Sequence, residues 1–408
     1  MPFRWSTRSE TADGRREACI DLLRKTYRPA QADLRVVLSP YRICPLGAHV
    51  DHQLGCVSGM PIDRGIALAF APGGGREVRL RSLDFPGEVA FSLDDTPPKA
   101  EGDWGNYPRG AVQALQRAWP LRCGLNGVIA GSLPIGGLSS SAAAGVAYLM
   151  ALGAVNDLCL SHDDLIALDR QVENEYLGLN NGVLDPSIIV AGRRGKLLHV
   201  DCLSNERRTL DAPEGMPAFE VLVVHSGVTQ ALVTTGYNRR VAECEEAARR
   251  LIEMAGTPTP ERPRLRLVPR AVFEAYGAEL PDPLRRRARH FFSEQDRVAG
   301  GVRAWAAGDL VRFGTLMNAS GQSSIENYEC GSPPLVALYE ILRDTKGVHG
   351  TRFSGAGFRG ACVALIDPAH RGEVEAEVRR RYPARCPAYR DRFSVHFCDT
   401  DDGSRMVA

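Results

Sequence analysis

The chain has 408 residues, of which 44% are hydrophobic and 24% are charged, and its formal net charge is +1. This length and composition predict a soluble globular protein of about two domains. A near-neutral charge argues against nucleic acid or an anionic membrane as the main partner, because both normally require a basic face. The expected partner is therefore a small molecule, and the protein is expected to be a monomer or a small homo-oligomer.

The first residues and the cysteines indicate a cytoplasmic protein. Residues 1–8 are too polar for a secretory signal, and the longest apolar run, Ala142–Val155, is too short to span a bilayer and is expected to be a buried helix. The chain has 11 cysteines and no Cys-x-x-Cys pair. Such an odd, scattered set fits reduced thiols better than a disulfide framework or a zinc site.

Hydrophobic periodicity and turn residues predict a mixed helix and strand fold. A capping box at Ser161–Asp164 marks the start of one helix. In chain order, the patterns predict helices at 10–27, 109–117, 162–177 and 237–254, and strands at 34–39, 65–71, 77–82, 196–200 and 219–224.

A polar stretch with prolines at 203–217 separates the last two strands. We place a domain boundary near residue 205, which gives an N-terminal domain of residues 1–205 and a C-terminal domain of residues 206–408. The proline-rich segment 257–263 shows no helix or strand pattern and is expected to be a surface loop.

Residues 131–143 run from an apolar strand through glycines into an Ala-rich helix. Gly136 and Gly137 allow a ligand to approach the backbone, and the unpaired N–H groups of a first helical turn from Ser139 favour an anion. A phosphate-binding loop has this pattern, but so does a serine-capped helix after a tight turn.

Two acidic residues follow this loop. Glu173 lies on the helix that begins at the capping box, and Asp185 precedes a proline at the expected start of the next helix. Taken alone, Asp185 is typical of a helix N-cap and Glu173 of a solvated helix face. Beside a phosphate loop, one of them would serve as a ligand for Mg²⁺ and the other as the acceptor of a substrate proton.

The loop at 40–52 gathers Arg42, His49, Asp51 and His52 between prolines and glycines. Polar loops of this kind are often sites. His49 and His52 have no further partners spaced to complete a metal cage, so recognition of hydroxyl groups is favoured over metal binding.

Residues 355–360 match Gly-x-Gly-x-x-Gly, the pattern of a dinucleotide-binding loop. The residues that follow, 361–366, have the length and composition of a strand, whereas a dinucleotide loop must open a helix. A glycine-rich turn between two strands, near a ligand, is the better interpretation. A Walker A motif is absent as well.

Four motifs occur in a characteristic order: Pro-Tyr-Arg…Gly-x-His-x-Asp (40–51), Gly-Leu-Ser-Ser-Ser-Ala (137–142), Gly-x-x-Asp (182–185) and Gly-x-Gly-Phe-x-Gly (355–360). This order resembles the GHMP small-molecule kinases. Residues 104–107, Tyr237–Arg240 with Cys244, Glu329, and the spacing from Glu173 to Asp185 are similar to galactokinases. The runs SPYRICPLGAH (39–49), SSIENYECG (323–331) and RFSGAGFRG (352–360) are similar to plant galacturonokinases.

The resemblance implies an α+β protein with the two-domain GHMP kinase fold. Its N-terminal domain would be like ribosomal protein S5, its C-terminal domain would be a ferredoxin-like α/β sandwich, and the active site would lie in the cleft between them. The implied reaction uses ATP and Mg²⁺ to phosphorylate the anomeric hydroxyl of a galactose-like sugar.

The resemblance also implies roles for individual residues. Asp185 would be the base, and Arg42 would keep it ionised and neutralise charge as the phosphoryl group transfers. The other implied site residues are Ala48, His49, Asp51, Gly182 and Tyr237 at the sugar; Pro134, Gly136, Gly137, Leu138, Ser139, Ser140 and Ser141 at the ATP phosphates; Trp104 and Tyr107 near the adenine; and Ser141 and Glu173 at the metal. Because the Pro134–Leu138 loop is one residue shorter than is usual in galactokinases, Ser140 is an alternative to Ser141 at the metal.

Two departures from galactokinases bear on the substrate. Ala48 stands where galactokinases have a glutamate facing the C6 hydroxyl, and without that charge a C6 carboxylate becomes tolerable. Arg359 stands where they usually have glycine, and it adds a cation able to form a bidentate pair with a carboxylate. A phosphate contact or an exposed loop position would explain Arg359 equally well.

The expected reaction therefore converts D-galacturonic acid and ATP to galacturonic acid 1-phosphate and ADP. Galactokinase and L-arabinokinase activities stay open, since arabinose lacks C6 and Ala48 alone would suit it. A sugar sensor that binds ATP and sugar without turnover also stays open, although the presence of Arg42, Glu173 and Asp185 argues against it.

Overall fold

The computed structural model describes residues 11–134, 136–228, 236–358 and 360–407. Its helices are α1 (Ala12–Tyr27), α2 (Asn106–Gln116), α3 (Ser140–Val155), α4 (His162–Gln171), α5 (Leu184–Ala191), α6 (Tyr237–Met254), α7 (Arg270–Tyr276), α8 (Asp282–Ala306), α9 (Leu310–Glu326), α10 (Pro333–Arg343) and α11 (Arg371–Arg385). Its strands are β1 (Arg35–Leu46), β2 (Cys56–Pro72), β3 (Glu77–Ser82), β4 (Glu88–Ser92), β5 (Leu125–Gly131), β6 (Leu197–Asp201), β7 (Glu206–Leu210), β8 (Glu220–His225), β9 (Val348–Phe353), β10 (Ala361–Ile366), β11 (Ser394–Cys398) and β12 (Arg405–Val407).

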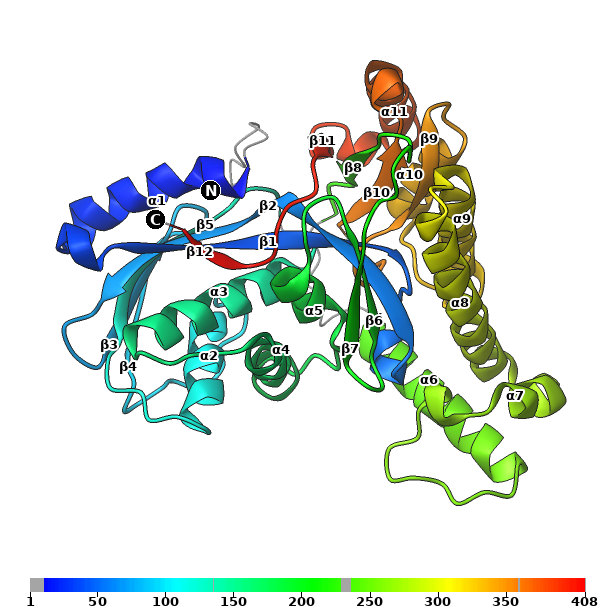
Figure 1. Ribbon diagram of the computed structural model, residues 1–408, viewed down its shortest axis with the longest axis horizontal. Coiled ribbons are helices and arrows are strands. Elements are labelled where there is room, and N and C mark those ends of the chain that lie inside the picture. The colour runs from blue at the N-terminus through cyan, green and yellow to red at the C-terminus, as the bar shows by residue number, and fades with distance from the viewer. Residues whose placement is uncertain (1–10, 135, 229–235, 359, 408) are drawn as a thin grey trace.

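The larger of the two sheets has the order β12-β1-β2-β5-β3-β4, with β6 paired to the other end of β2 and β7 paired to β6. Helix α1 covers one face, and α2 to α5 lie on the other (Figure 1). Side chains of β1 alternate between these faces: Val36 and Leu38 pack with α1, whereas Val37 and Tyr41 join the core that contains α3. Because both faces are covered, every residue of β1 after Arg35 is buried.

The second sheet is antiparallel and has the order β11-β8-β10-β9. Helices α9 and α10 pack on β9, α8 packs on α9, and α6 packs on α8. This sheet lies beside one end of the larger sheet in Figure 1. Helices α8 and α9 also contact β1, so the two halves share one hydrophobic core.

Most of the predicted elements are present. The bounds of β3 and α6 are as predicted, α4 begins directly after the Ser161 capping box, and residues 257–263 form no helix or strand. The strand predicted at 65–71 is the second half of the longer β2. The helix predicted to reach 177 ends at Gln171, and a π-helical turn at Val172–Tyr176 continues it.

The polar stretch with prolines at 203–217 contains a strand that was not predicted, β7. Most β7 side chains are polar and exposed, so this edge strand shows no apolar alternation. Both β7 and the C-terminal β12 belong to the larger sheet. The proposed boundary near 205 therefore falls just before a strand of that sheet, and the last residues of the chain return to it.

In the described part of the chain, no helix is long and apolar enough to cross a membrane. The apolar run singled out in the sequence is α3, which is buried between the larger sheet and the helices beside it.

Candidate active site

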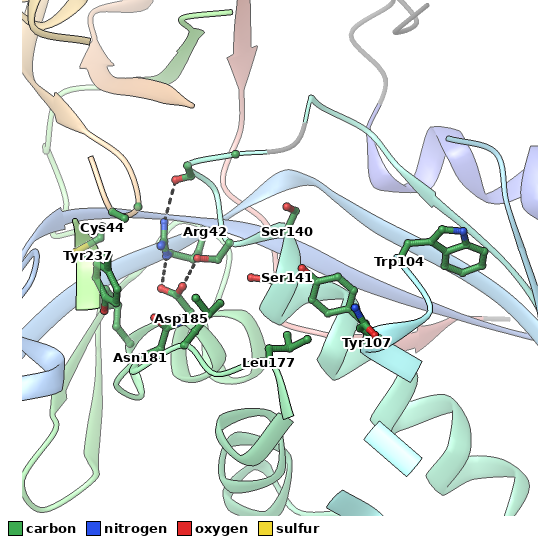
Figure 2. Close-up of a pocket in the computed structure, with 18 of the residues that line it drawn as sticks. Arg42, Cys44, Trp104, Tyr107, Ser140, Ser141, Leu177, Asn181, Asp185 and Tyr237 are labelled. Carbon is green, nitrogen blue, oxygen red and sulfur yellow. Dashed lines mark hydrogen bonds and ion pairs between the residues drawn. The ribbon is translucent and has the colours of Figure 1, made fainter. Parts of the chain in front are cut away.

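A cavity of about 710 Å³ lies where the glycine-rich loop, the start of α3 and the turn between β9 and β10 meet. Figure 2 shows Trp104 and Tyr107 toward one end, Ser140 and Ser141 in the middle, and Arg42, Asp185 and Tyr237 toward the other. The cavity therefore has an aromatic end, a middle lined by serines and a charged end.

Most of the residues predicted from the sequence line this cavity: Arg42, Ala48, His49, Asp51, Trp104, Tyr107, Gly136, Gly137, Ser139, Ser140, Ser141, Asp185 and Tyr237. Pro134, Leu138, Glu173 and Gly182 are not among the lining residues. Leu138 is buried in the core. A Cβ on Gly182 would meet Asp51 Oδ2 at 2.5 Å, so Gly182 packs against the loop at 40–52 instead. Arg359 lies outside the described residues, and its predicted contact stays a prediction.

The two glycine motifs pack backbone against backbone. Gly136 and Gly137 have φ values of +127° and +84°, which favour glycine strongly. A Cβ on Gly360 would lie 2.6 Å from the carbonyl carbon of Gly136, and one on Gly137 would lie 2.8 Å from the nitrogen of Ala361. The late motif is a turn between β9 and β10, as predicted, and it supports the loop that precedes α3.

Helix α3 begins at Ser140, one residue later than expected. Ser139 has a left-handed backbone (φ 56°), and its hydroxyl donates to Asp185 Oδ2 instead of capping the helix. The serine-capped alternative is therefore wrong. The first N–H groups of α3 have no side-chain cap, and Ser140 and Ser141 beside them line the cavity. This arrangement favours an anion at the start of α3.

Arg42 and Asp185 form an ion pair at the charged end, in which Arg42 is buried and Asp185 is partly exposed. Arg42 Nε donates to Asp185 Oδ1 at 2.7 Å, and only 3% of the Arg42 side chain is exposed. Burial disfavours the charge of Arg42, but Asp185 more than compensates, so the pKa of Arg42 lies above its ordinary value. The N-cap of α5 is Val183, so the N-cap alternative for Asp185 is wrong: its carboxylate faces Arg42 and the cavity.

Glu173 lies on the π-helical turn and is 2% exposed. Asn181 Nδ2 donates to its Oε2 at 2.7 Å, whereas Oε1 has no hydrogen-bond partner within the described residues. Burial, and then the charge of Asp185, raise the pKa of Glu173 to about 7, and the nearby Ser141 hydroxyl opposes this rise.

An unpartnered buried carboxylate oxygen near a serine hydroxyl fits Mg²⁺, which binds one or two carboxylates together with substrate phosphates. The residues present thus fit the predicted metal site at Ser141 and Glu173. No group of three or more His, Cys, Asp or Glu side chains in the described ranges is arranged to hold a metal without such phosphates.

The predicted sugar-binding residues are held by buried polar and aromatic neighbours. His49 has a φ of 59°, stacks on Tyr328 with ring centroids 4.2 Å apart, and places Nε2 3.4 Å from Cys330 Sγ. His52 Nε2 lies 3.1 Å from the Tyr328 hydroxyl. Burial lowers the pKa of His49 well below its ordinary value, so the ring is neutral.

Asp51 belongs to the same loop and lies near the Arg42–Asp185 pair. Burial, and then the nearby charge of Asp185, raise its pKa to about 6, while the backbone N–H groups of His52 and Leu184 act in the opposite direction. Asp51 lines the cavity.

The sequence analysis missed several lining residues, among them Phe85, Lys99, Asn181 and Arg352. Phe85 stacks beside Trp104, with ring centroids 6.4 Å apart. Two of them had a local signal: Asn181 precedes Gly182 in the motif before Asp185, and Arg352 begins the run RFSGAGFRG. Phe85 and Lys99 come from segments without a motif and reach the cavity through the fold.

Comparison with known proteins identifies the class of this fold. The sequence matches the GHMP kinases N terminal domain over residues 106–193 and the GHMP kinases C terminal domain over residues 302–384. A solved structure of Lactococcus lactis galactokinase in complex with galactose superposes with a TM-score of 0.86 at 27% identity, covering 94% of this chain and 98% of that one. Methanococcus jannaschii mevalonate kinase shares the fold alone, with a TM-score of 0.64 at 17% identity, covering 91% and 100%.

Two proteins with similar sequences narrow the class of kinase to which this chain is similar. A galacturonokinase of Arabidopsis thaliana is 45% identical over 92% of this chain and 94% of its own length. A galactokinase of Roseiflexus sp. strain RS-1 is 34% identical over 91% and 93%. The chain therefore belongs to the GHMP kinases, as the ordered motifs had indicated, and has their two-domain fold.

Proposed function

We propose that this chain is an ATP-dependent kinase that phosphorylates the anomeric hydroxyl of D-galacturonic acid, giving galacturonic acid 1-phosphate and ADP. The observation that carries the proposal is the Arg42–Asp185 pair, which faces the cavity beside the glycine-rich loop and the start of α3. The 45% identity to a galacturonokinase supports the substrate.

In this proposal, Asp185 accepts the proton of the anomeric hydroxyl as that oxygen attacks the terminal phosphorus of ATP and the bond to the bridging oxygen breaks. Arg42 holds Asp185 in place through Nε and keeps positive charge beside the transferring group. Ser139 directs the second carboxylate oxygen of Asp185. Catalysis then rests mainly on positioning and electrostatics, as in other phosphoryl transfers.

The phosphates would lie against the glycine-rich loop and the uncapped start of α3. The adenine ring of ATP would lie between Trp104, Tyr107 and Phe85. Ser141 and Glu173 would hold Mg²⁺, which neutralises phosphate charge when it is bound. Mg²⁺ as the cofactor and a cytoplasmic location are parts of this proposal.

Two features of the charged end favour a uronic acid. Ala48 lines the cavity with a methyl group, so no carboxylate stands at this position. The buried guanidinium of Arg352 lies close enough to lower the pKa of the thiols of Cys44 and Cys330, against the larger effect of burial. Its Nη1 also lies 4.0 Å from the buried Glu294 Oε1, which offsets part of this charge, so the positive charge that Arg352 supplies at this end is a part of the proposal. Arg359 is a second proposed source of positive charge.

The test is ATP-dependent ADP release with D-galacturonate, D-galactose and L-arabinose side by side in Mg²⁺. The highest kcat/KM for galacturonate supports the proposal. A higher value for galactose or arabinose makes the chain a galactokinase or an arabinokinase with a tolerant C6 pocket. No turnover with any of the three, combined with measurable ATP binding, favours a sugar sensor.

A further inference from the structure

The end of strand β8 holds both glycine motifs of the active site. His225, the last residue of β8, is 3% exposed, and its Nε2 lies 3.1 Å from the carbonyl oxygen of Gly136. Since a carbonyl oxygen only accepts, Nε2 is the donor. The next residue, Ser226, donates to the carbonyl oxygen of Gly360 through its backbone N–H at 2.8 Å and its hydroxyl at 2.7 Å.

The hydrogen bond from His225 has a directional consequence. In a planar trans peptide, the C=O of one residue and the N–H of the next point in opposite directions. Binding the Gly136 carbonyl to His225 therefore turns the Gly137 N–H away from the second sheet. Gly137 lines the cavity, and its own carbonyl accepts from Arg42 Nη1 at 3.4 Å.

Gly136 and Gly137 are two successive glycines, and both have positive φ values. A pair of glycines has more backbone conformations available than any other pair of residues. An external contact that fixes one of their peptide planes reduces the ordering that phosphate binding must supply. His225 comes from a different sheet from the one that leads into the loop, so it also ties the loop to the second half of the protein.

We infer that His225 is a positioning residue that orients the N–H of Gly137 toward the phosphates of the bound nucleotide. It contacts neither the transferring phosphoryl group nor the sugar, and it acts through the loop. The inference rests on the proposed function, because it assigns the loop to nucleotide phosphates.

The test compares variants that keep or remove a donor at the position of Nε2. In His225→Gln the side-chain amide nitrogen replaces Nε2, in His225→Asn it falls short, and in His225→Leu there is no donor. His396→Leu is the matched control: His396 lies on the neighbouring strand β11, is 8% exposed, and bonds through Nε2 to Ser394 Oγ at 2.8 Å.

The readout is the affinity for the non-hydrolysable analogue AMP-PNP relative to adenosine, measured by calorimetry. We expect His225→Leu and His225→Asn to lose about tenfold in AMP-PNP affinity with adenosine unchanged. His225→Gln and His396→Leu should stay near the wild type. KM for the sugar should not change in any of them.

Equal AMP-PNP affinity in the Asn and Gln variants overturns the inference, even if the Leu variant fails to fold. A wild type that binds adenosine and AMP-PNP equally well overturns the assignment of the loop to phosphates, and with it the proposed function. The two failures are therefore distinguishable.

Discussion

Two regions of the cavity are built in different ways. One is the serine-lined middle, where we propose that the nucleotide phosphates bind, and which we call the phosphate end. The other is the charged end, where we propose that the sugar binds, and which we call the sugar end. At the phosphate end, the backbones of the Gly136–Gly137 loop and of the turn at Gly355–Gly360 touch directly, with no side chain between them. At the sugar end, buried side chains from distant segments hold one another: His49 against Tyr328, His52 against the same tyrosine, and His290 Nε2 against the carbonyl oxygen of Ala48 at 3.0 Å.

This difference predicts where each end tolerates change. The phosphate end depends on backbone N–H groups, which every residue except proline carries, so it is damaged mainly by an added Cβ or a displaced loop. The sugar end depends on the identity of side chains, so single substitutions can alter its preference without altering the fold. Nucleotide use should be constant across variants of the sugar end, whereas sugar choice should vary.

Arg42 and Asp185, the proposed catalytic pair, lie at the sugar end and also contact the glycine-rich loop, so their loss should have the largest effect. Asp185→Asn keeps the shape but removes the proton acceptor, so kcat should fall by about 10²- to 10⁴-fold. AMP-PNP affinity should stay within a few-fold of the wild type, and Asp185→Ala should likewise bind ATP without phosphorylating sugar. Single-turnover assays and calorimetry measure the two quantities. Near-normal turnover in either variant removes Asp185 from the role of base.

Gly360→Ala tests the backbone packing at the phosphate end. The added Cβ would lie 2.6 Å from the carbonyl carbon of Gly136, so the loop must move. A displacement of about 1 Å near the reacting groups can cost about 100-fold in kcat, and we expect a loss of that order.

Gly87→Ala is the matched control for this substitution. Its φ of +87° is close to the +91° of Gly360, but a Cβ there would meet no atom within 4 Å. Both variants carry the backbone strain of about 1–2 kcal/mol, and only Gly360→Ala carries the clash. Similar kinetics in the two would show that the packing of the glycine motifs does not matter for turnover.

Ala48→Glu tests whether the sugar end sets specificity. The introduced carboxylate would face the C6 carboxylate of galacturonate, and like charges in a binding site cost enough to lower kcat/KM by about 30-fold. The same carboxylate can accept a hydrogen bond from the C6 hydroxyl of galactose, so preference should shift toward that sugar. Ala48→Gln, which matches the size without the charge, should lose less galacturonate activity. An unchanged ratio of the two sugars in Ala48→Glu would contradict the C6 argument.

The same contrast explains how much of the molecule could be predicted from the sequence. The residues of the phosphate end are contiguous in the sequence, so Gly136, Gly137 and the serines after them could be identified from the local sequence pattern. Elements with strong periodicity, such as α6 and β3, were equally predictable. The exposed edge strand β7 was not, because its polar side chains carry no pattern.

At the sugar end, prediction reached His49 and Asp51 through one loop but not the residues that hold them. Tyr328 and Arg352 both lie within runs that resemble galacturonokinases, SSIENYECG and RFSGAGFRG, but nothing in these runs assigned either residue to the site. Their burial against the loop at 48–52 depends on the packing of α8, α9 and the second sheet on β1 and β2, which no local pattern reports. Asp185 was ambiguous until the structure showed which group its carboxylate faces.

Tyr328 gives the smallest and most selective test of the comparison. Tyr328→Phe removes the hydroxyl that contacts His52 but keeps the ring stacked on His49, so KM for the sugar should rise by only about threefold. Tyr328→Leu also removes the stack that holds His49 in its left-handed conformation, and its KM for the sugar should rise further. In both variants KM for ATP should stay constant, because the phosphate loop makes no use of this ring. If KM for ATP rises in parallel with KM for the sugar, the two ends are not independent, and the side-chain network at the sugar end also supports the phosphate loop.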